Sequence, residues 1–342
     1  MADRVGPRGQ AGREPLTGSV SVVVPVYRVA DTIEACLQSV AEQTLAPGQV
    51  ILVDDAGGDE SMEIAVATAE RLGLPYEVVI HPANAGMGAA RNSGLARVRG
   101  EFVWFLDSDD TAEPTFLAEL MQAITSTEAA FAICRTLRVD PGGVALGVVE
   151  EVYWRRVCPG PDIARELLRG RLRAYACNKL FRTAQFDPAP FPVGRAYEDF
   201  VPMVRLALNS HRVAVVNRPL YRYRDSPGSI SNRFDRHTFD LLLVRKQIEA
   251  LFEARADADE FADDLLVHRY AQVLLPIANM ALRAAADTGS TPLTREAVTL
   301  VRHRIRPAQV VRLARLGEFR LATAAETLWL SSRVYAGILR WR

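Results

Sequence analysis

A short acidic segment holds the residue types that are best suited to do chemistry. The apolar run 102–106 leads directly into Asp107, Asp109 and Asp110. Carboxylates so close together at the edge of a core repel one another unless a cation neutralises them. Asp107 and Asp109 lie two residues apart, so on a turn both can face one hard ion, Mg²⁺ or Mn²⁺. The alternative is the acidic start of a helix, because Pro114 follows and Asp favours N-caps.

Buried strands and helices have to hold this segment in place. The run 102–106 is typical of a strand buried on both faces of a parallel sheet, and the carboxyl ends of such strands border the ligand crevice. Three earlier strands, near 20–26, 50–53 and 76–80, alternate with helical segments. This β-α-β order predicts an α/β fold with a mostly parallel sheet flanked by helices.

A glycine-rich loop, residues 84–94, comes directly before the acidic strand. Its glycines permit close backbone approach to a ligand. A helix that starts near Gly88 would aim its free N–H groups outward, as anion-binding helices do, and Arg91 could then meet a phosphate. A turn with a solvated arginine is the alternative. Next to a metal site, a phosphate site would suit a metal-bridged diphosphate.

A second acidic pair, Glu198 and Asp199, precedes an amphipathic helical pattern that begins near Val201. Acids at a helix start complement the helix dipole, an effect worth less than ~1 kcal/mol. The pair is therefore either a local stabilising feature or a second functional site.

Four motifs, in this order, resemble the family 2 glycosyltransferases with the GT-A fold. They are Val-Pro-Val-Tyr, Val-Asp-Asp-Ala-Gly-Gly-Asp, Asn-x-Gly…Ala-Arg-Asn-x-Gly and Phe-Leu-Asp-Ser-Asp-Asp. The resemblance implies a Rossmann-like sheet and covers roughly residues 19–234. Two motifs depart from the usual family pattern. Residues 54–59, Asp-Asp-Ala-Gly-Gly-Asp, stand where Asp-Asp-Gly-Ser-x-Asp is usual, with the acids kept and one small polar position lost. Arg28 replaces the Asn that follows the tyrosine.

The resemblance also implies roles for individual residues. Asp55 would accept hydrogen bonds from the nucleotide base, and Asp107 would meet the ribose or a metal-bound water. Asp109 would ligate the metal, together with Asp107. The residues implied to bind the nucleotide-sugar are Val24, Pro25, Tyr27, Asp55, Asn84, Gly86, Arg91, Asp107 and Ser108.

The implied reaction moves a hexosyl or N-acetylhexosaminyl group from a nucleotide-sugar, with a UDP-sugar favoured, to an acceptor hydroxyl. Asp199, rather than Glu198, would take the proton from that hydroxyl, and the anomeric carbon would be inverted. The acceptor would be a glycan, a lipid-linked molecule or a small molecule, in the synthesis of a cell-surface polysaccharide or glycoconjugate.

Two other functions have to be weighed against this reaction. A sugar nucleotidyltransferase should carry a glycine-rich signature with Arg and Lys directly after the first strand, and residues 24–27 contain none. A non-catalytic nucleotide-sugar-binding scaffold would not need acids at both sites. Slow metal-dependent hydrolysis of a donor would separate the enzyme from the scaffold.

The composition narrows the choice of partners and compartment. The 41 basic and 41 acidic side chains cancel, which gives no electrostatic case for nucleic-acid binding. The four cysteines are far apart and form no metal or redox motif, so buried free thiols in the cytoplasm are expected. No apolar run approaches the ~20 residues of a membrane span. Residues 1–18 are expected to form a disordered leader.

The remaining chain divides into a GT-A domain, residues 19–234, and a helical region, residues 235–342. The resemblance implies that residues 225–231 form a mobile loop that closes over the donor, and their Gly and Ser content fits such a loop. Near the C-terminus, arginines interleave with Trp329, Tyr335, Ile338 and Trp341. This tail either contacts anionic lipid at the inner face of the plasma membrane or packs on the protein with its arginines in solvent.

Overall fold

The computed structural model describes residues 16–153, 155–225, 234–253 and 255–339. A ten-stranded sheet runs in the order β3-β2-β1-β4-β9-β6-β10-β5, with β7 beside β6 and β8 beside β10. The pairs β3-β2, β2-β1, β1-β4 and β6-β10 are parallel, as the β-α-β order predicts. The strands are β1 (Leu16–Val26), β2 (Gln49–Asp54), β3 (Tyr76–Ile80), β4 (Gly100–Phe105), β5 (Thr111–Ala112), β6 (Phe131–Val139), β7 (Ala145–Val148), β8 (Val157–Cys158), β9 (Lys179–Arg182) and β10 (Val213–Arg224).

Helices cover both faces of this sheet, so the strands read as continuous apolar runs. One core unites α3, α5 and α6 with alternate strand residues such as Val23 and Phe105. The other unites α1, α2 and α4 with residues such as Val24 and Trp104. These helices are α1 (Ile33–Ala41), α2 (Ser61–Arg71), α3 (Met87–Leu95), α4 (Phe116–Thr127), α5 (Gly160–Arg169) and α6 (Phe200–Asn209). All four cysteines are buried and free, as predicted.

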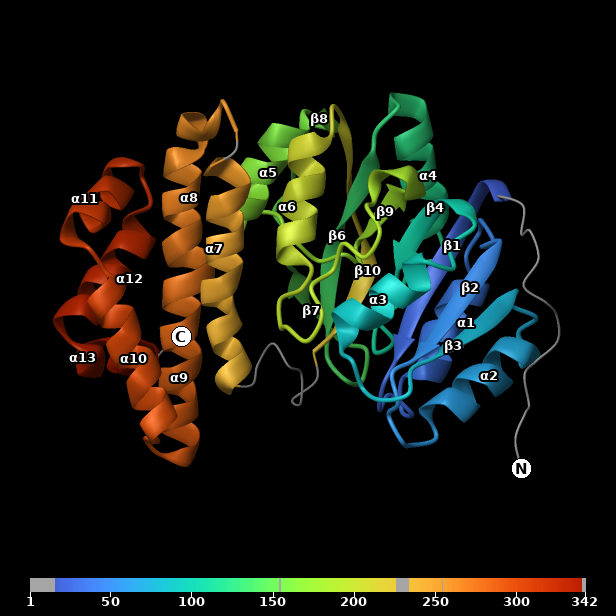
Figure 1. Cartoon of the computed structure of the whole chain (residues 1–342), viewed down its shortest axis with the longest axis horizontal. Coiled ribbons are helices and arrows are strands. Elements are labelled where there is room, and N and C mark those ends of the chain that lie inside the picture. The colour runs from blue at the N-terminus through green and yellow to red at the C-terminus, as the bar shows by residue number, and fades with distance from the viewer. Residues whose placement is uncertain (1–15, 154, 226–233, 254, 340–342) are drawn as a thin grey trace.

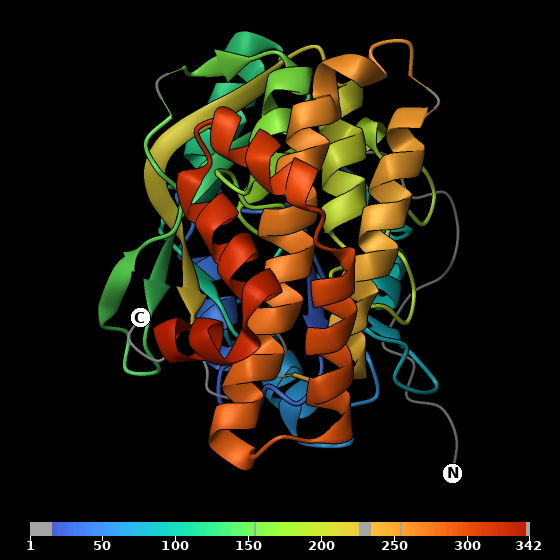
Figure 2. The same cartoon turned by 90° about the vertical axis from the view of Figure 1, so that its left-hand side faces the viewer.

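A helical region follows the sheet and gathers at one side of it, beyond α5 and α6 (Figure 1). Turned by 90°, these helices stand in front of the sheet (Figure 2). They have a core of their own, which includes Tyr270, Val301 and Leu328. They are α7 (Asp240–Glu253), α8 (Ala262–His268), the π-helix η5 (Arg269–Leu274), α9 (Leu275–Thr288), α10 (Pro292–Arg304), α11 (Pro307–Arg315), α12 (Phe319–Leu330) and α13 (Ser332–Leu339).

The expectation that no segment is long and apolar enough for a membrane span is wrong. The continuous helix Ala258–Thr288 meets that criterion by length and composition. More than half of its apolar window, 56%, is buried inside the protein, as in the core helix of a helical region. Polar residues such as Gln272 interrupt the window, so it contains no unbroken apolar run of the length of a membrane span.

Two boundaries differ from those expected. β1 begins at Leu16, inside the expected leader, because Leu16 pairs with Gly100 at the start of β4. The sequence predicts two strands, near 213–216 and 219–224, but they form the single strand β10, with irregular register between Val216 and Tyr221. Of the expected mobile loop, only Asp225 lies within the described residues.

Candidate active site

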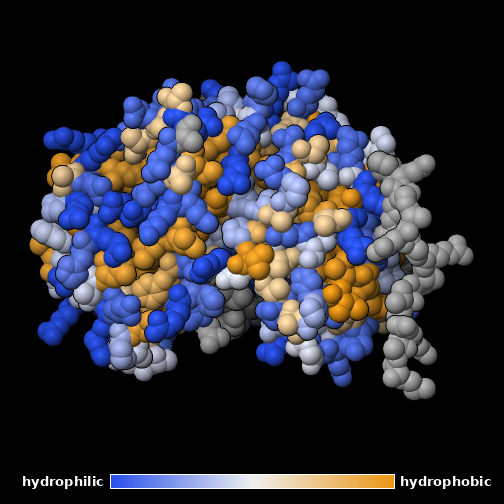
Figure 3. Space-filling model, viewed as in Figure 1, coloured by the Kyte–Doolittle hydropathy of each residue, from blue (hydrophilic) through white to orange (hydrophobic). Residues whose placement is uncertain are grey.

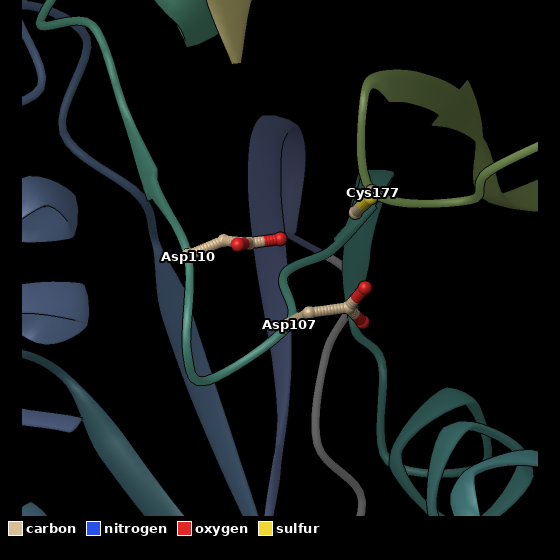
Figure 4. A group of neighbouring side chains, drawn as sticks. All are labelled: Asp107, Asp110 and Cys177. Carbon is tan, nitrogen blue, oxygen red and sulfur yellow. The ribbon is translucent and has the colours of Figure 1, made fainter. Parts of the chain in front are cut away.

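The acidic segment forms a tight turn after β4, at the carboxyl end of that buried strand. The amide of Asp110 donates to the carbonyl of Asp107, which closes the turn. Asp107, Asp110 and Cys177 each place one potential ligand atom within 4.8 Å of the others. Figure 4 shows the two carboxylates extending from this one turn beside Cys177. Two effects raise the pKa of Asp109 to about 6: burial is the larger, and the negative charge of Asp107 is the second. The second effect is the repulsion predicted for these acids.

The chemistry of the individual side chains decides which of them suit a hard cation. Asp110 is buried, and its two oxygens accept hydrogen bonds from the Tyr221 hydroxyl at 2.5 Å and the Arg224 amide at 2.7 Å. Burial and the neighbouring carboxylates raise the pKa of Cys177, which keeps it a thiol, a poor ligand for Mg²⁺ or Mn²⁺. Asp107 and the partly exposed Asp109 are therefore the better fit.

The two aspartates at the end of β2 point to different surroundings, as alternation along a strand requires. Both oxygens of Asp55 are used inside the protein: they accept from the amides of Ala85 and Gly86 at 2.9 Å, and Oδ1 lies 2.8 Å from His81 Nδ1. Asp54 instead lines a cavity of about 560 Å³. Because successive side chains of a strand face opposite sides, the strand period could have predicted that Asp54 and Asp55 have different surroundings. The presence of two adjacent acids does not by itself show which of them faces a cavity.

This cavity lies at the carboxyl ends of β1 and β2. Its other lining residues are Val26, His81 and residues 56–63, which form the turn after β2 and the start of α2. Val24 and Pro25, which the resemblance implies to bind the nucleotide-sugar, are buried in the sheet and do not line this cavity. Tyr27 is 39% exposed at the strand end, with the Arg28 guanidinium 5.2 Å from its ring centre.

The glycine-rich loop packs against protein at two of its glycines. A Cβ on Gly88 would lie 2.1 Å from the Pro192 carbonyl oxygen, and one on Gly94 would lie 2.2 Å from Val23. These glycines therefore bring α3 close to neighbouring protein, a function that the loop sequence could not distinguish from close approach of a ligand. Asn84 is exposed, and Ser108 is buried with its carbonyl accepting from the Thr32 hydroxyl.

Arg91 joins the two predicted acidic sites. Its guanidinium donates to Asp107 at 2.8 Å and to Glu198 at 2.5 Å, although these residues are far apart in sequence. The side chain is almost fully buried, and Phe191 packs 5.6 Å from it. Burial alone disfavours the charge, but the facing carboxylates more than offset this and raise the pKa of Arg91. No sequence signal indicated that this arginine pairs with carboxylates.

Asp199 lies at the end of this chain of charges, as the N-cap residue of α6. Burial, and then the adjacent Glu198 charge, raise its pKa to about 7, against an opposing effect of Arg91. Lys179, which is fully buried on β9, also favours its charged form. A carboxylate with a pKa near neutrality suits proton transfer at physiological pH. Asp107, Arg91, Glu198 and Asp199 thus share one neighbourhood.

Three non-glycine residues beside these sites have left-handed backbone angles, at Arg28 (φ 53°), Ala56 (φ 56°) and Tyr197 (φ 59°). Asparagine and glycine adopt this conformation most easily. Positions 28 and 56, where the usual family motifs have Asn and Gly, are therefore places where those residues would be relaxed.

Comparison with known proteins places these features in a family. Residues 21–187 match the family model described as glycosyl transferase family 2. EpsH of Bacillus subtilis, which is named as a glycosyltransferase, is 30% identical over 243 residues, covering 69% of each chain. The match with GlyA, a glycosyltransferase of Streptococcus pneumoniae, is 29% identical and covers 62% of this chain and 31% of GlyA.

Solved structures share the fold over nearly the whole chain. Residues 1–349 of TarS from Staphylococcus aureus, in complex with UDP-GlcNAc, superpose with a TM-score of 0.67 at 21% identity, covering 92% of this chain and 91% of that one. The mannosyltransferase PcManGT of Pyrobaculum calidifontis, in complex with GDP-Man and Mn²⁺, gives 0.54 at 17% identity, covering 95% and 87%. By motif order, fold and sequence identity, the chain belongs to glycosyl transferase family 2.

Proposed function

We propose that the protein transfers a hexosyl or N-acetylhexosaminyl group from a UDP-sugar to an acceptor hydroxyl, with inversion at the anomeric carbon. The observation that carries this proposal is the Arg91 bridge, which connects Asp107 to Glu198 by two short ion pairs. It puts the carboxylates suited to a diphosphate-bound cation and those suited to a base into one site. Neither the nucleotidyltransferase nor the scaffold function calls for that arrangement.

The donor end of the site uses two groups of residues. The cavity at the ends of β1 and β2 is large enough for a nucleoside, and Asp54 on its wall offers an acceptor to a base N–H. Asp107 and Asp109 would hold Mg²⁺ or Mn²⁺, which would neutralise the departing diphosphate. Arg91, which lies one turn after the start of α3, adds a fixed positive charge beside Asp107. Asp55 keeps the 84–86 loop in place.

The acceptor end uses Asp199. With its pKa raised to about 7, this carboxylate is part ionised near neutral pH and can take the proton of a hydroxyl as that oxygen attacks the sugar. Glu198 is held by Arg91 and so orients the pair. An attack from the side opposite the diphosphate gives inversion.

The names of similar proteins support the choice of donor and product. TarS is described as a poly(ribitol-phosphate) β-N-acetylglucosaminyltransferase, and its structure contains UDP-GlcNAc. Another similar protein, TuaG of Bacillus subtilis, is named for teichuronic acid biosynthesis. These names favour a UDP-sugar donor and an acceptor in cell-surface polysaccharide synthesis.

The test is a thermal-shift screen of UDP-sugars and GDP-mannose with and without Mn²⁺, followed by assay of nucleotide release. We expect a UDP-sugar to stabilise the protein more when Mn²⁺ is present. Asp109→Asn and Asp199→Asn should each abolish transfer, while Asp287→Asn, an exposed carboxylate at the end of α9, should not. Near-normal turnover in either of the first two variants would remove that residue's role.

We also propose that the C-terminal helices rest on anionic lipid. Residues 292–342 contain ten arginines and three glutamates, while the rest of the chain has an excess of acids. Large apolar side chains on α12 and α13 are exposed, including Phe319 (67%), Leu330 (65%) and Val334 (57%). Figure 3 shows apolar patches between hydrophilic side chains over the C-terminal helices. Apolar side chains among arginines suit the interface of an anionic bilayer.

Vesicle co-sedimentation tests this contact. The full chain should bind vesicles that contain anionic lipid and not vesicles of neutral lipid alone. The double variant Arg320→Glu with Arg333→Glu should lose that binding, whereas Arg212→Glu, an exposed arginine beside the sheet, should keep it. Equal binding by both variants would remove the proposed contact.

A further inference from the structure

The segment that carries the predicted base approaches α6 through an unfavourable backbone angle. Tyr197 has φ 59°, a conformation that a residue with a side chain rarely adopts. Glu198 and Asp199 follow it immediately, so the direction of both carboxylates depends on that angle. Such a conformation persists only where the surrounding structure enforces it. The contacts of residues 195–200 show which parts of the molecule do so.

On one side, the segment is attached to the C-terminal helical region. Asp240, the first residue of α7, accepts a hydrogen bond from the Ala196 amide at 3.1 Å and another from Arg195 at 3.3 Å. The Tyr197 hydroxyl lies 3.9 Å from the sulfur of Met280 on α9. The Asp240 side chain is only 12% exposed, so water competes weakly for its contact with Ala196.

A contact between two aromatic rings also connects the helical region to the chain directly after Asp199. Phe200, directly after Asp199, packs on His268 of α8 with ring centres 4.9 Å apart. His268 is buried, and burial first, then the Arg245 charge, lower its pKa to about 3, so the ring is neutral. The helical region therefore contacts the chain on both sides of the Glu198–Asp199 pair.

On the other side, α3 holds the segment and the loop before it. Arg91 donates to Glu198 at 2.5 Å, and the Asn92 side chain exchanges two hydrogen bonds with the backbone of Phe191. Residues 195–200 thus lie between two parts of the protein. One is α3, which packs on the sheet, and the other is α7–α9, which lie beyond the residues matched by the family model.

We infer that the C-terminal helical region completes the active site, and that Asp240 is a positioning residue for the Glu198–Asp199 pair through its hydrogen bond to the Ala196 amide. This inference rests on the proposed role of Asp199 as the base. Asp240 fixes one end of the turn and Arg91 fixes the other. The left-handed angle at Tyr197 is held between them, directly before the Glu198–Asp199 pair.

The test compares Asp240→Ala with Asp240→Asn. The asparagine keeps an oxygen that accepts from the Ala196 amide, whereas the alanine has none. Asp263→Ala is the matched control, since Asp263 is also an acid in the first turn of a helix of this region but pairs with Arg312. Each variant is assayed for nucleotide release from UDP-glucose, UDP-galactose and UDP-N-acetylglucosamine with Mn²⁺, with water as the acceptor, and for the dissociation constant of the donor that is turned over.

We expect Asp240→Ala to lower the rate of donor hydrolysis by about 10²-fold, the cost of a misplacement of roughly 1 Å, with the donor dissociation constant unchanged within a factor of about two. Asp240→Asn should recover most of that rate, and Asp263→Ala should behave like the unaltered protein. Hydrogen exchange needs no donor: amides 196–200 should exchange faster in Asp240→Ala alone.

Unchanged exchange of these amides in Asp240→Ala would overturn the inference, as would equal rate losses in the alanine and asparagine variants. A parallel loss of donor affinity would also overturn it, because it would indicate a general structural role. Asp199→Asn separates the two proposals. If that variant retains hydrolysis, the base assignment fails whatever Asp240 does; if it loses hydrolysis while Asp240→Ala does not, only the positioning role fails.

Discussion

Replacing Arg91 by methionine tests the electrostatics of the site most directly. The arginine pairs with Asp107 at 2.8 Å and with Glu198 at 2.5 Å, and 3% of its side chain is exposed. Methionine keeps much of the apolar volume but removes the charge. Breaking a buried ion pair by removing one partner typically costs about 3–5 kcal/mol, because the other partner stays buried without compensation. We expect a loss of free energy of unfolding in that range at about pH 8.

The loss should depend on pH in a defined direction. Arg91 opposes the rise in the pKa of Asp199, so its removal should move that pKa further above about 7. A carboxyl whose folded-state pKa exceeds its unfolded value of about 3.9 stabilises the fold at low pH, and this contribution disappears as the pH rises through the folded-state value. Arg91→Met should therefore cost less near pH 6 than near pH 8, by up to about 1.4 kcal/mol, because only the pH unit between the folded-state pKa of about 7 and the upper pH of the experiment contributes to the difference.

Urea denaturation at the two pH values measures both quantities. Arg212→Met is the control: Arg212 pairs with Glu128 at 3.2 Å, but both side chains are more than half exposed. Exposed pairs contribute about 0–1 kcal/mol, so this variant should lose little at either pH. If Arg91→Met costs no more than Arg212→Met, or costs the same near pH 6 as near pH 8, the charge coupling described for this site is wrong.

Three further predictions concern stability and rate. Ala56→Gly should stabilise the protein by up to about 1 kcal/mol, because glycine adopts the left-handed backbone angle of this position without strain. Ala67→Gly, on the exposed face of α2, is the control and should destabilise the protein by a similar amount. Equal changes of the two variants in urea denaturation would contradict this prediction. Tyr221→Phe should cost about 1–3 kcal/mol, since buried Asp110 then loses its hydroxyl donor, and a neutral substitution would show that Asp110 finds another partner. The pH profile of kcat/KM for transfer should rise through about pH 7 and then level off, because Asp199 has to lose its proton to act as a base; a flat profile across neutral pH would exclude that role.

The elements that carry the site were largely predictable because their signals are local. Strand β4 and the acids after it follow from five apolar residues that run into three carboxylates. Parallel pairing of the first strands follows from alternation with helices. The site residues were harder to predict: Asp54 faces the cavity while Asp55 holds a loop, a difference set by which side of the strand each acid leaves.

The sequence by itself determined the α/β architecture, the acidic turn, the second acidic pair and the family. These features follow from periodicity and short motifs, which depend on residues close to one another in the sequence. Only the tertiary structure decided that Arg91 connects Asp107 to Glu198, and that Asp240 holds the turn before Asp199. The partners in these contacts are 16 to 107 residues apart. No local pattern encodes such a pairing, because it depends on how α3, α6 and α7 pack after the sheet has formed.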